Sequence, residues 1–336
     1  MNYSKGFIRL NWITLVLIYL VIFAGSFVRI TGSGMGCPDW PKCFGKWVPP
    51  TEVTELPFNY RQIYLEKRQK KVEKFCKFLS AIGMKETANK IKNDPEVYVE
   101  EAFNPARTWT EYLNRLVGFL AGNALLICFL WMLFRYRKSG LVGIAFLNLI
   151  ILGVEAWFGS IVVATNLVPW TITLHMFLAL VIVAIQMYVL YKVSPVQSRK
   201  LSFDKTMRWM IYIVLGITFY QMFLGTQVRE SIDLLTKQGF GRDTWTDKLG
   251  MAFYIHRSFS WLVLGLLAYM AFHNEKSEKH FAVRLAFIVL AIELTSGVLL
   301  AYADMPGLVQ TSHLIFASLL FGILWMTSLR IKRINR

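Results

Sequence analysis

The sequence has few charged residues and few cysteines. Only 17% of its 336 residues are charged and four are cysteine, whereas 55% are hydrophobic. A water-soluble protein of this size would not contain eight apolar runs of about 20 residues, each long enough to cross a hydrocarbon layer of about 30 Å. The composition excludes a soluble protein and predicts an all-α integral membrane protein with spans at 11–28, 111–134, 141–165, 168–191, 209–228, 251–272, 281–303 and 308–329.

The N-terminus lacks the features of a removable targeting segment. Its first apolar run is too long for a signal peptide and has no small-residue cleavage site, and no Arg/Ser-rich segment precedes it. We therefore expect a bacterial cytoplasmic membrane rather than an organelle.

Basic residues are absent from the short outer loops 166–170 and 304–307, and seventeen lie in segments expected on the inner side. The positive-inside rule then places both termini in the cytoplasm. The loop at 29–107 contains fourteen basic residues and must lie outside, but loops this long cross the membrane largely regardless of charge. The net charge of +16 thus points to membrane lipids, and needs no nucleic acid to explain it.

The two halves of the chain repeat one another. Three motifs recur in the same order: Gly25 to Arg29 as Gly225 to Arg229, Asn114-Arg115 as His256-Arg257, and Glu155, Gly159 and His175 as Glu293, Gly297 and His313. An even number of helices per unit predicts two pseudo-symmetric, parallel four-helix bundles. We place the first in residues 1–200, with the outer loop 29–107, and the second in 201–336. Within this loop, 61–92 predicts an amphipathic helix on the outer surface.

Three histidines, His175, His256 and His313, lie near the outer ends of predicted membrane helices. Ionisable groups inside membranes are usually functional, and imidazole is an axial ligand of haem iron. His256 and His313 can face each other across one bundle, which predicts a haem held between them. An interhelical hydrogen bond is the alternative for any one of these histidines.

The first half differs from the second at two matching positions. Asn114 replaces His256, so we expect only His175 to ligate a haem there, with the opposite iron face weakly ligated or open. Glu111 replaces Phe253 and lies on the same helix face as Asn114. We expect this carboxylate to act in catalysis, as proton acceptor or electrostatic stabiliser. The alternative is an acid favoured by the helix dipole.

Four arginines lie at outer helix ends near the level of the histidines: Arg29, Arg115, Arg229 and Arg257. Guanidinium groups bind carboxylates in bidentate fashion, which predicts contacts with haem propionates. Snorkelling to lipid phosphates is the alternative. Cys37 and Cys43 lie in the first outer loop, on the oxidising side, where a disulfide is stable; a metal site is the rival interpretation.

These residues resemble a known family. The stretch Gly-Ser-Phe-Val-Arg-Ile-Thr-Gly-Ser-Gly-Met-Gly-Cys-Pro-Asp-Trp-Pro-Lys-Cys, from Gly25 to Cys43, closely resembles the helix-one signature of the haem A synthases. Glu111-Tyr-Leu-Asn-Arg115, His175, Tyr-Ile-His256-Arg257 and His313 follow in the family's order. The resemblance covers nearly the whole chain.

The resemblance implies an enzyme that oxidises a ring methyl group of haem O, through a hydroxylated stage, to the formyl group of haem A. Its partners would be haem O synthase and cytochrome oxidase assembly factors. It implies haem B between His256 and His313, haem O at His175, a functional glutamate at Glu111 and paired cysteines at Cys37 and Cys43. The departure is Asn114, where better-known members have histidine.

Two other functions fit parts of the sequence. One is a non-catalytic membrane cytochrome or haem O carrier, which Asn114 favours. The other is a transporter built from parallel repeats, against which the absence of broken helices in the sequence argues.

Overall fold

The computed structural model describes residues 2–99, 102–165, 169–277 and 279–332. Eight helices within these residues are long and apolar enough to cross a membrane, and the prediction of an all-α integral membrane protein is confirmed. They are α1 (Lys5–Ile30), α4 (Pro105–Arg135), α5 (Leu141–Ala164), α6 (Pro169–Val193), α7 (Lys205–Lys237), α9 (Met251–Lys276), α10 (Phe281–Tyr302) and α11 (Gly307–Arg330). The start of the predicted span 168–191, most of the outer loop 166–170 and the last four residues lie outside the described ranges.

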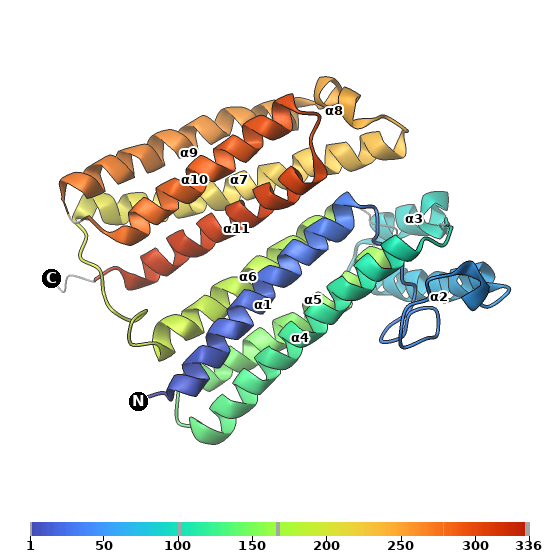
Figure 1. The fold of residues 1–336 in the computed structure, drawn as a ribbon, viewed down its shortest axis with the longest axis horizontal. Coiled ribbons are helices and arrows are strands. Elements are labelled where there is room, and N and C mark those ends of the chain that lie inside the picture. Colours follow the sequence, from blue (N-terminus) through green and yellow to red (C-terminus); the bar gives the residue numbers. More distant parts are fainter. Residues whose placement is uncertain (1, 100–101, 166–168, 278, 333–336) are drawn as a thin grey trace.

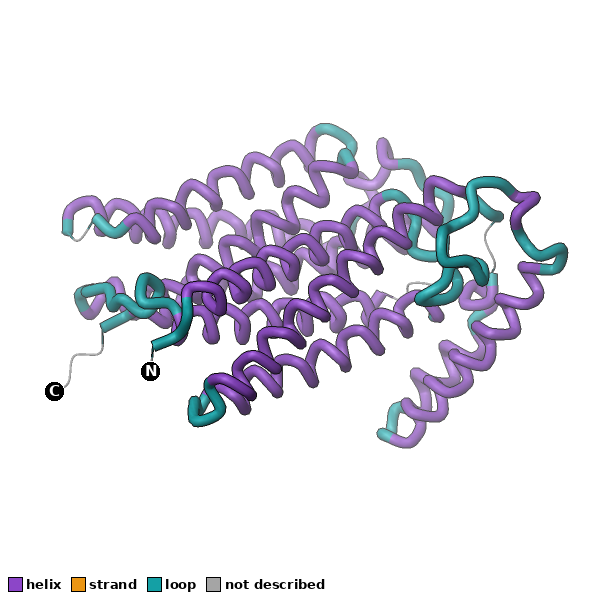
Figure 2. The backbone as a smooth tube through the Cα atoms, turned by 60° about the horizontal axis from the view of Figure 1, so that its bottom comes forward, coloured by secondary structure: helices purple, strands orange, loops and turns teal. Residues whose placement is uncertain are grey.

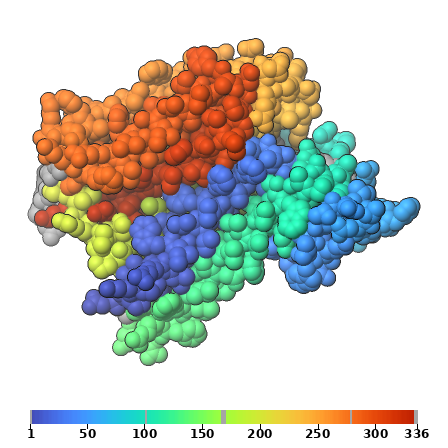
Figure 3. Space-filling view, viewed as in Figure 1, coloured from blue at the N-terminus to red at the C-terminus, as the bar shows by residue number. Residues whose placement is uncertain are grey.

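The long helices form two groups (Figure 1). In the first, α1, α4, α5 and α6 pack as a closed ring in that order; α7, α9, α10 and α11 do the same in the second. Helix α11 also packs against α1 and α6 and joins the groups. The space-filling view shows the second group, in orange and red, lying along the blue and green first group (Figure 3). The shared neighbour order agrees with the predicted repeat, whose symmetry and domain boundaries remain predictions.

Several helices extend beyond the predicted spans, because capping and ion pairs stabilise extra turns: α1 begins at Lys5 rather than 11, behind the Ser4 cap, and α4 and α7 are also longer. Helix α4 begins at Pro105 rather than 111, where the Asn104 side chain accepts a hydrogen bond from the Arg107 backbone N at 3.1 Å. Helix α7 continues past the predicted end at 228 to Lys237. Its last turns carry Arg229 and Asp233, which lie one turn apart and pair at 2.9 Å.

The outer loop contains most of the remaining structure. The predicted single helix at 61–92 is instead two helices, α2 (Tyr60–Ala81) and α3 (Lys85–Asn93). They are separated at Gly83, whose φ of +90° is one that glycine adopts readily. Two 3₁₀ turns lie at Val53–Glu55 and Pro95–Tyr98, and α8 (Arg242–Lys248) follows α7. The predicted Cys37–Cys43 disulfide is present.

Candidate haem-binding sites

The second bundle brings His256 and His313 together. His256 is on α9 and His313 on α11, and their ring centroids are 6.3 Å apart with planes inclined at 81°. Two imidazoles that share an axial metal would have centroids roughly 6 Å apart, from about 2 Å per metal–nitrogen bond and about 1 Å from nitrogen to ring centre. The separation therefore fits a haem iron between the two rings.

The Nδ1 atom of His313 is held by its neighbour helix. It lies 2.8 Å from the Ser296 Oγ, 3.2 Å from the Glu293 carbonyl oxygen and 3.2 Å from the Glu293 carboxylate, all on α10. Metal-ligating histidines commonly use one ring nitrogen for such a contact and the other for the metal. This arrangement leaves Nε2 of His313 for a ligand.

The first bundle repeats half of this arrangement. On α6, His175 has its Nδ1 2.9 Å from the Glu155 carboxylate on α5, and its side chain is 38% exposed. Asn114, in the position of His256, has its side-chain oxygen buried without a hydrogen-bond partner in the described part of the chain. The first bundle therefore offers one imidazole and one amide where the second offers two imidazoles.

Glu111 is tied to the outer loop. Its carboxylate is buried, accepts a hydrogen bond from the Cys37 backbone N at 2.7 Å, and forms an ion pair with Arg115. Arg115 also donates to the Asp39 carbonyl at 2.8 Å. Glu111 thus connects α4 to the disulfide-closed loop that lies over the outer end of the first bundle.

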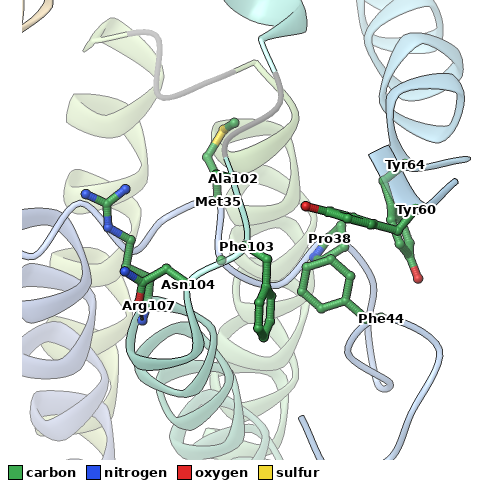
Figure 4. Close-up of a pocket in the computed structure, with 10 residues that line it drawn as sticks. Met35, Pro38, Phe44, Tyr60, Tyr64, Ala102, Phe103, Asn104 and Arg107 are labelled. Carbon is green, nitrogen blue, oxygen red and sulfur yellow. Dashed lines mark hydrogen bonds between the residues drawn. The ribbon is translucent and has the colours of Figure 1, made fainter. Parts of the chain in front are cut away.

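That loop packs tightly. Phe44 makes edge contacts with the rings of Tyr60, Tyr64 and Phe103 at 5.4 to 5.9 Å. The same rings line a cavity of about 20 Å³, with Asn104 and Arg107 on its other side (Figure 4). A water molecule needs about 10–15 Å³, so this cavity has room for about one water molecule and is far too small for a porphyrin.

The four arginines that the sequence suggested as propionate contacts have different partners. Arg29 of the first bundle and Arg229 of the second both pair with Asp233, and Arg229 also donates to Gln310. The Nε atoms of both arginines are buried with no hydrogen-bond partner among the residues described. In contrast, Arg115 pairs with Glu111, and Arg257 donates to the Tyr302 hydroxyl at 2.9 Å.

Arg29 and Arg229 are suited to an anionic ligand. Each lies one helical turn beyond a glycine, Gly25 or Gly225, that faces Asn114 or His256. The two guanidinium groups share the Asp233 carboxylate, which neutralises only one of their two charges. The donors and the charge fit a haem propionate.

Several residues in these contacts were not predicted from the sequence. Asp233 and Gln310 had no recognised role, and Ser296 was not singled out. Asp233 is four residues after Arg229, a spacing that signals a contact only if the helix continues past 228. Ser296 is next to Gly297 in the repeated motif, but its counterpart Phe158 is apolar, so comparison of the repeats does not reveal it.

Comparison with known proteins agrees with the resemblance found in the sequence. The COX15-CtaA family, described as cytochrome oxidase assembly protein, matches residues 8–325. The chain is 23% identical to the heme A synthase of Geobacillus kaustophilus (strain HTA426), over 93% of this chain and 86% of that protein. It is 24% identical to the heme A synthase of Wolbachia pipientis wMel, over 91% and 87% of the two chains. The corresponding protein of Nitrosomonas eutropha is 25% identical over 92% and 89%. Because the family match covers nearly the whole chain, this protein belongs to the COX15-CtaA family of cytochrome oxidase assembly proteins.

Proposed function

We propose that this protein is a haem A synthase, an oxidoreductase that converts a ring methyl group of haem O to the formyl group of haem A. Family membership and relatives named heme A synthase over most of their length support this function. The main structural support for this function is the difference between the two bundles. The second bundle has two imidazoles 6.3 Å apart, whereas the first has a single imidazole across from the helix of Asn114. One resident cofactor site and one substrate site follow from it.

His256 and His313 would hold haem B as its two axial ligands. Bound there, haem B would supply one-electron transfer. The contacts of Ser296 and Glu293 fix the ring orientation of His313 before the cofactor binds. Arg29 and Arg229 would bind its propionates, and Asp233 holds these arginines in place.

His175 would ligate the substrate, haem O, with Glu155 orienting the imidazole. Glu111 would accept a proton or stabilise positive charge during oxidation of the methyl group. Its bonds to Cys37 and Arg115 hold the carboxylate in one position and exclude water from it. Arg115 and Arg257 remain candidate haem contacts that would have to leave their present partners.

This function implies a cellular setting. We infer that the protein resides in the bacterial cytoplasmic membrane with both termini inside. Both termini lie at the same end of the helices, as an even number of spans requires (Figure 1). Haem O synthase is the expected supplier of substrate, and cytochrome oxidase assembly factors are the expected recipients of product.

A second function, a non-catalytic haem O carrier, is favoured by one observation. The side-chain oxygen of Asn114, which has no partner among the described residues, lies where a second imidazole would complete the substrate site. Chromatography of haems extracted from the protein, purified from cells that also make haem O, separates the two. Haem A beside haem B, absent from a vector control, is the expected result. Haem B with unmodified haem O only would contradict the synthase and favour the carrier.

A further inference from the structure

Helices α2 and α3 form an arm at the outer end of the first bundle. A shared apolar cluster attaches this arm to α5, with buried residues on all three helices: Val72, Phe75, Leu79, Ala88, Ile91, Ile161 and Ala164. Figure 2 shows the arm leaving the outer end of the bundle and slanting back along its side. The tip of the arm, residues 78–84, therefore points toward the inner end of the molecule.

The tip reaches membrane depth. The Phe78 ring centroid is 5.4 Å from that of Trp157 on α5. Trp157 is seven residues before the outer end of α5 at Ala164, which is about 10 Å at 1.5 Å per residue. Because α5 crosses the membrane, a side chain that packs beside Trp157 on the outside of the bundle lies at the level of the outer leaflet rather than in water.

The tip is apolar on its uncovered side. Phe78 is 46% exposed, Ile82 54% and Met84 39%, although all three are large and hydrophobic. Trp157 beside them is 42% exposed. A cluster of this kind marks a surface that meets lipid or another protein, and tryptophan is typical of membrane interfaces.

The rest of the arm is strongly basic. Residues 60–93 contain ten lysines and arginines against three glutamates. Five lysines of α2 are exposed: Lys67, Lys70, Lys71, Lys74 and Lys77. Two glutamates form ion pairs within the arm, Glu73 with Lys77 and Glu86 with Lys90. The arm's own acidic residues therefore leave most of its positive charge unneutralised. Basic residues just above an apolar tip match the negative phosphates of anionic phospholipids.

We propose that the α2–α3 arm is a membrane anchor whose tip inserts into the outer leaflet and whose lysines bind anionic phospholipid headgroups. The depth of the tip, its exposed apolar side chains and the charge of α2 all fit a lipid surface in the same place. This proposal does not depend on the proposed function, because none of the arm's exposed residues belongs to a haem site.

Collision accessibility of spin labels tests the insertion. The full-length protein would carry a nitroxide at Ile82→Cys, in bilayer nanodiscs that contain phosphatidylglycerol. Asn93→Cys, exposed at the far end of α3, is the matched control. Background labelling should be low, because Cys76 and Cys128 are buried and burial raises the pKa of the Cys76 thiol.

The label at Ile82→Cys should be accessible to oxygen and protected from an aqueous nickel chelate. The label at Asn93→Cys should be accessible to the chelate. Equal access of both labels to the chelate would overturn the insertion. Protection of the Ile82→Cys label from both reagents would place the tip against a protein and would overturn the lipid assignment.

Retention of lipid by the purified protein tests the role of charge. A triple Lys70→Gln, Lys74→Gln, Lys77→Gln variant should lose phosphatidylglycerol in native mass spectrometry by roughly tenfold or more. The matching triple Lys→Arg variant keeps the charge and should retain the lipid as the unsubstituted protein does. Equal retention by the Gln variant would overturn headgroup binding by these lysines.

Discussion

Each of the three membrane histidines lies against a glycine of the neighbouring helix. A methyl group built at Gly159 would be 3.0 Å from Cε1 of His175, and methyl groups at Gly225 and Gly297 would be 3.3 Å from Cε1 of His256 and of His313. At the fourth matching position of the repeats, Gly25 faces Asn114 in the same way but at a greater distance. The glycines of the repeated motifs therefore make room for rings rather than for a closer approach of helix backbones.

Substitution of Gly159 by alanine should disturb only the substrate site. The added methyl group would displace the His175 ring, because 3.0 Å is too close for two carbon atoms. Haem O binding should fall by about 10- to 100-fold, as for other changes that misorient a metal ligand, while haem B binding stays normal. Titration with haem O followed by absorption spectroscopy measures this.

Gly153→Ala is the control on the same helix, because nothing described lies within 4 Å of its added methyl group. Alanine there should leave binding unchanged and favour the helix by up to about 1 kcal/mol. Equal losses of haem O binding in both variants would contradict a specific fit of Gly159 to His175.

Substitutions can separate the proposed chemical role of Glu111 from its positional role at Cys37. Glu111→Gln keeps an oxygen that accepts from the Cys37 backbone N but removes the carboxylate charge. Glu111→Ala removes both. If the carboxylate takes part in the oxidation, both variants should retain haem B and lose product by about 100-fold or more. The measurement is haem A produced per haem B in extracted haems.

The opposite outcome is product formation at the wild-type rate by the Gln variant, with loss only in the Ala variant. That result would contradict a chemical role and show that Glu111 only positions the Cys37 loop. Comparison of the repeats singled out Glu111 from the sequence, because its counterpart is Phe253. Its bond to Cys37 could not be predicted, because the two residues are 74 positions apart and no repeated motif connects them.

At the scale of the helices, the inner part of the two bundles differs as much as the outer part. Helices α1, α4, α5 and α6 bury a polar set near their inner ends: Asn11, Thr14, Cys128, Asn148 and Gln186. The spacing of the repeat aligns these with five residues of the apolar core of the second bundle: Ile211, Val214, Met270, Ala286 and Leu324. At these positions the first bundle thus has buried polar side chains where the second has apolar packing.

Two leucine substitutions in this polar set should have opposite effects. Asn148 has both side-chain polar atoms buried and without partners among the described residues, so Asn148→Leu should be neutral or stabilising by up to about 1 kcal/mol. Gln186 donates to the Asn11 side-chain oxygen at 3.1 Å and to its carbonyl at 3.2 Å. Gln186→Leu should therefore cost about 1–3 kcal/mol, since it leaves the Asn11 side-chain oxygen without its donor in the membrane, although the Asn11 amide still donates to the Phe7 carbonyl.

Thermal unfolding of both variants in the same detergent measures the difference. A loss of stability in Asn148→Leu as large as in Gln186→Leu would contradict the unpaired state of Asn148 and indicate a bound partner there.

Helix identity could be predicted from the sequence, but helix ends could not. Apolar runs gave all eight spans because each must cross the same thickness of hydrocarbon. The extra turns of α4 and α7 are polar and are stabilised by the Asn104 cap and the Arg229–Asp233 pair. Because the predicted span of α7 ended at 228, Asp233 was not recognised as a functional residue. The contact of Arg29 and Arg229 with Asp233 was therefore not predicted either.

At the scale of the whole molecule, α1 and α6 meet α11 along most of their length. Arg29 pairs with Asp233 at the outer end, and Ser26 donates to Thr311 at 3.2 Å. Farther in, the Tyr19 hydroxyl donates to the Ser318 carbonyl at 3.3 Å. The repeats predicted two similar units from the sequence, but not this junction, because a repeat relates positions within each unit and says nothing of the contacts between the units.

The predicted division of the chain can be tested by cutting it. The linker after α6 is exposed at Val196, and its later part, at Leu201, already pairs with Ile331 of the second half. Fragments 1–196 and 197–336, expressed together, should copurify and bind haem B as the intact chain does. The second fragment contains both ligands of the predicted haem B site and every neighbour that orients His313.

Asp233→Ala in the second fragment should weaken this association. Its loss leaves two guanidinium groups, 23% and 21% exposed, without the carboxylate that they share, and breaking such a partly buried ion pair costs up to about 3 kcal/mol. Copurification should fall by about tenfold or more, while His256 and His313 should keep haem B on the second fragment, at reduced affinity because Asp233 also holds the proposed propionate-binding arginines. The Asp247→Ala variant, which removes an exposed acid of the same fragment, is the control. Fragments that fail to copurify, or a second fragment that loses haem B in the presence of the first, would contradict a boundary near residue 200, because the site would then depend on an unbroken chain.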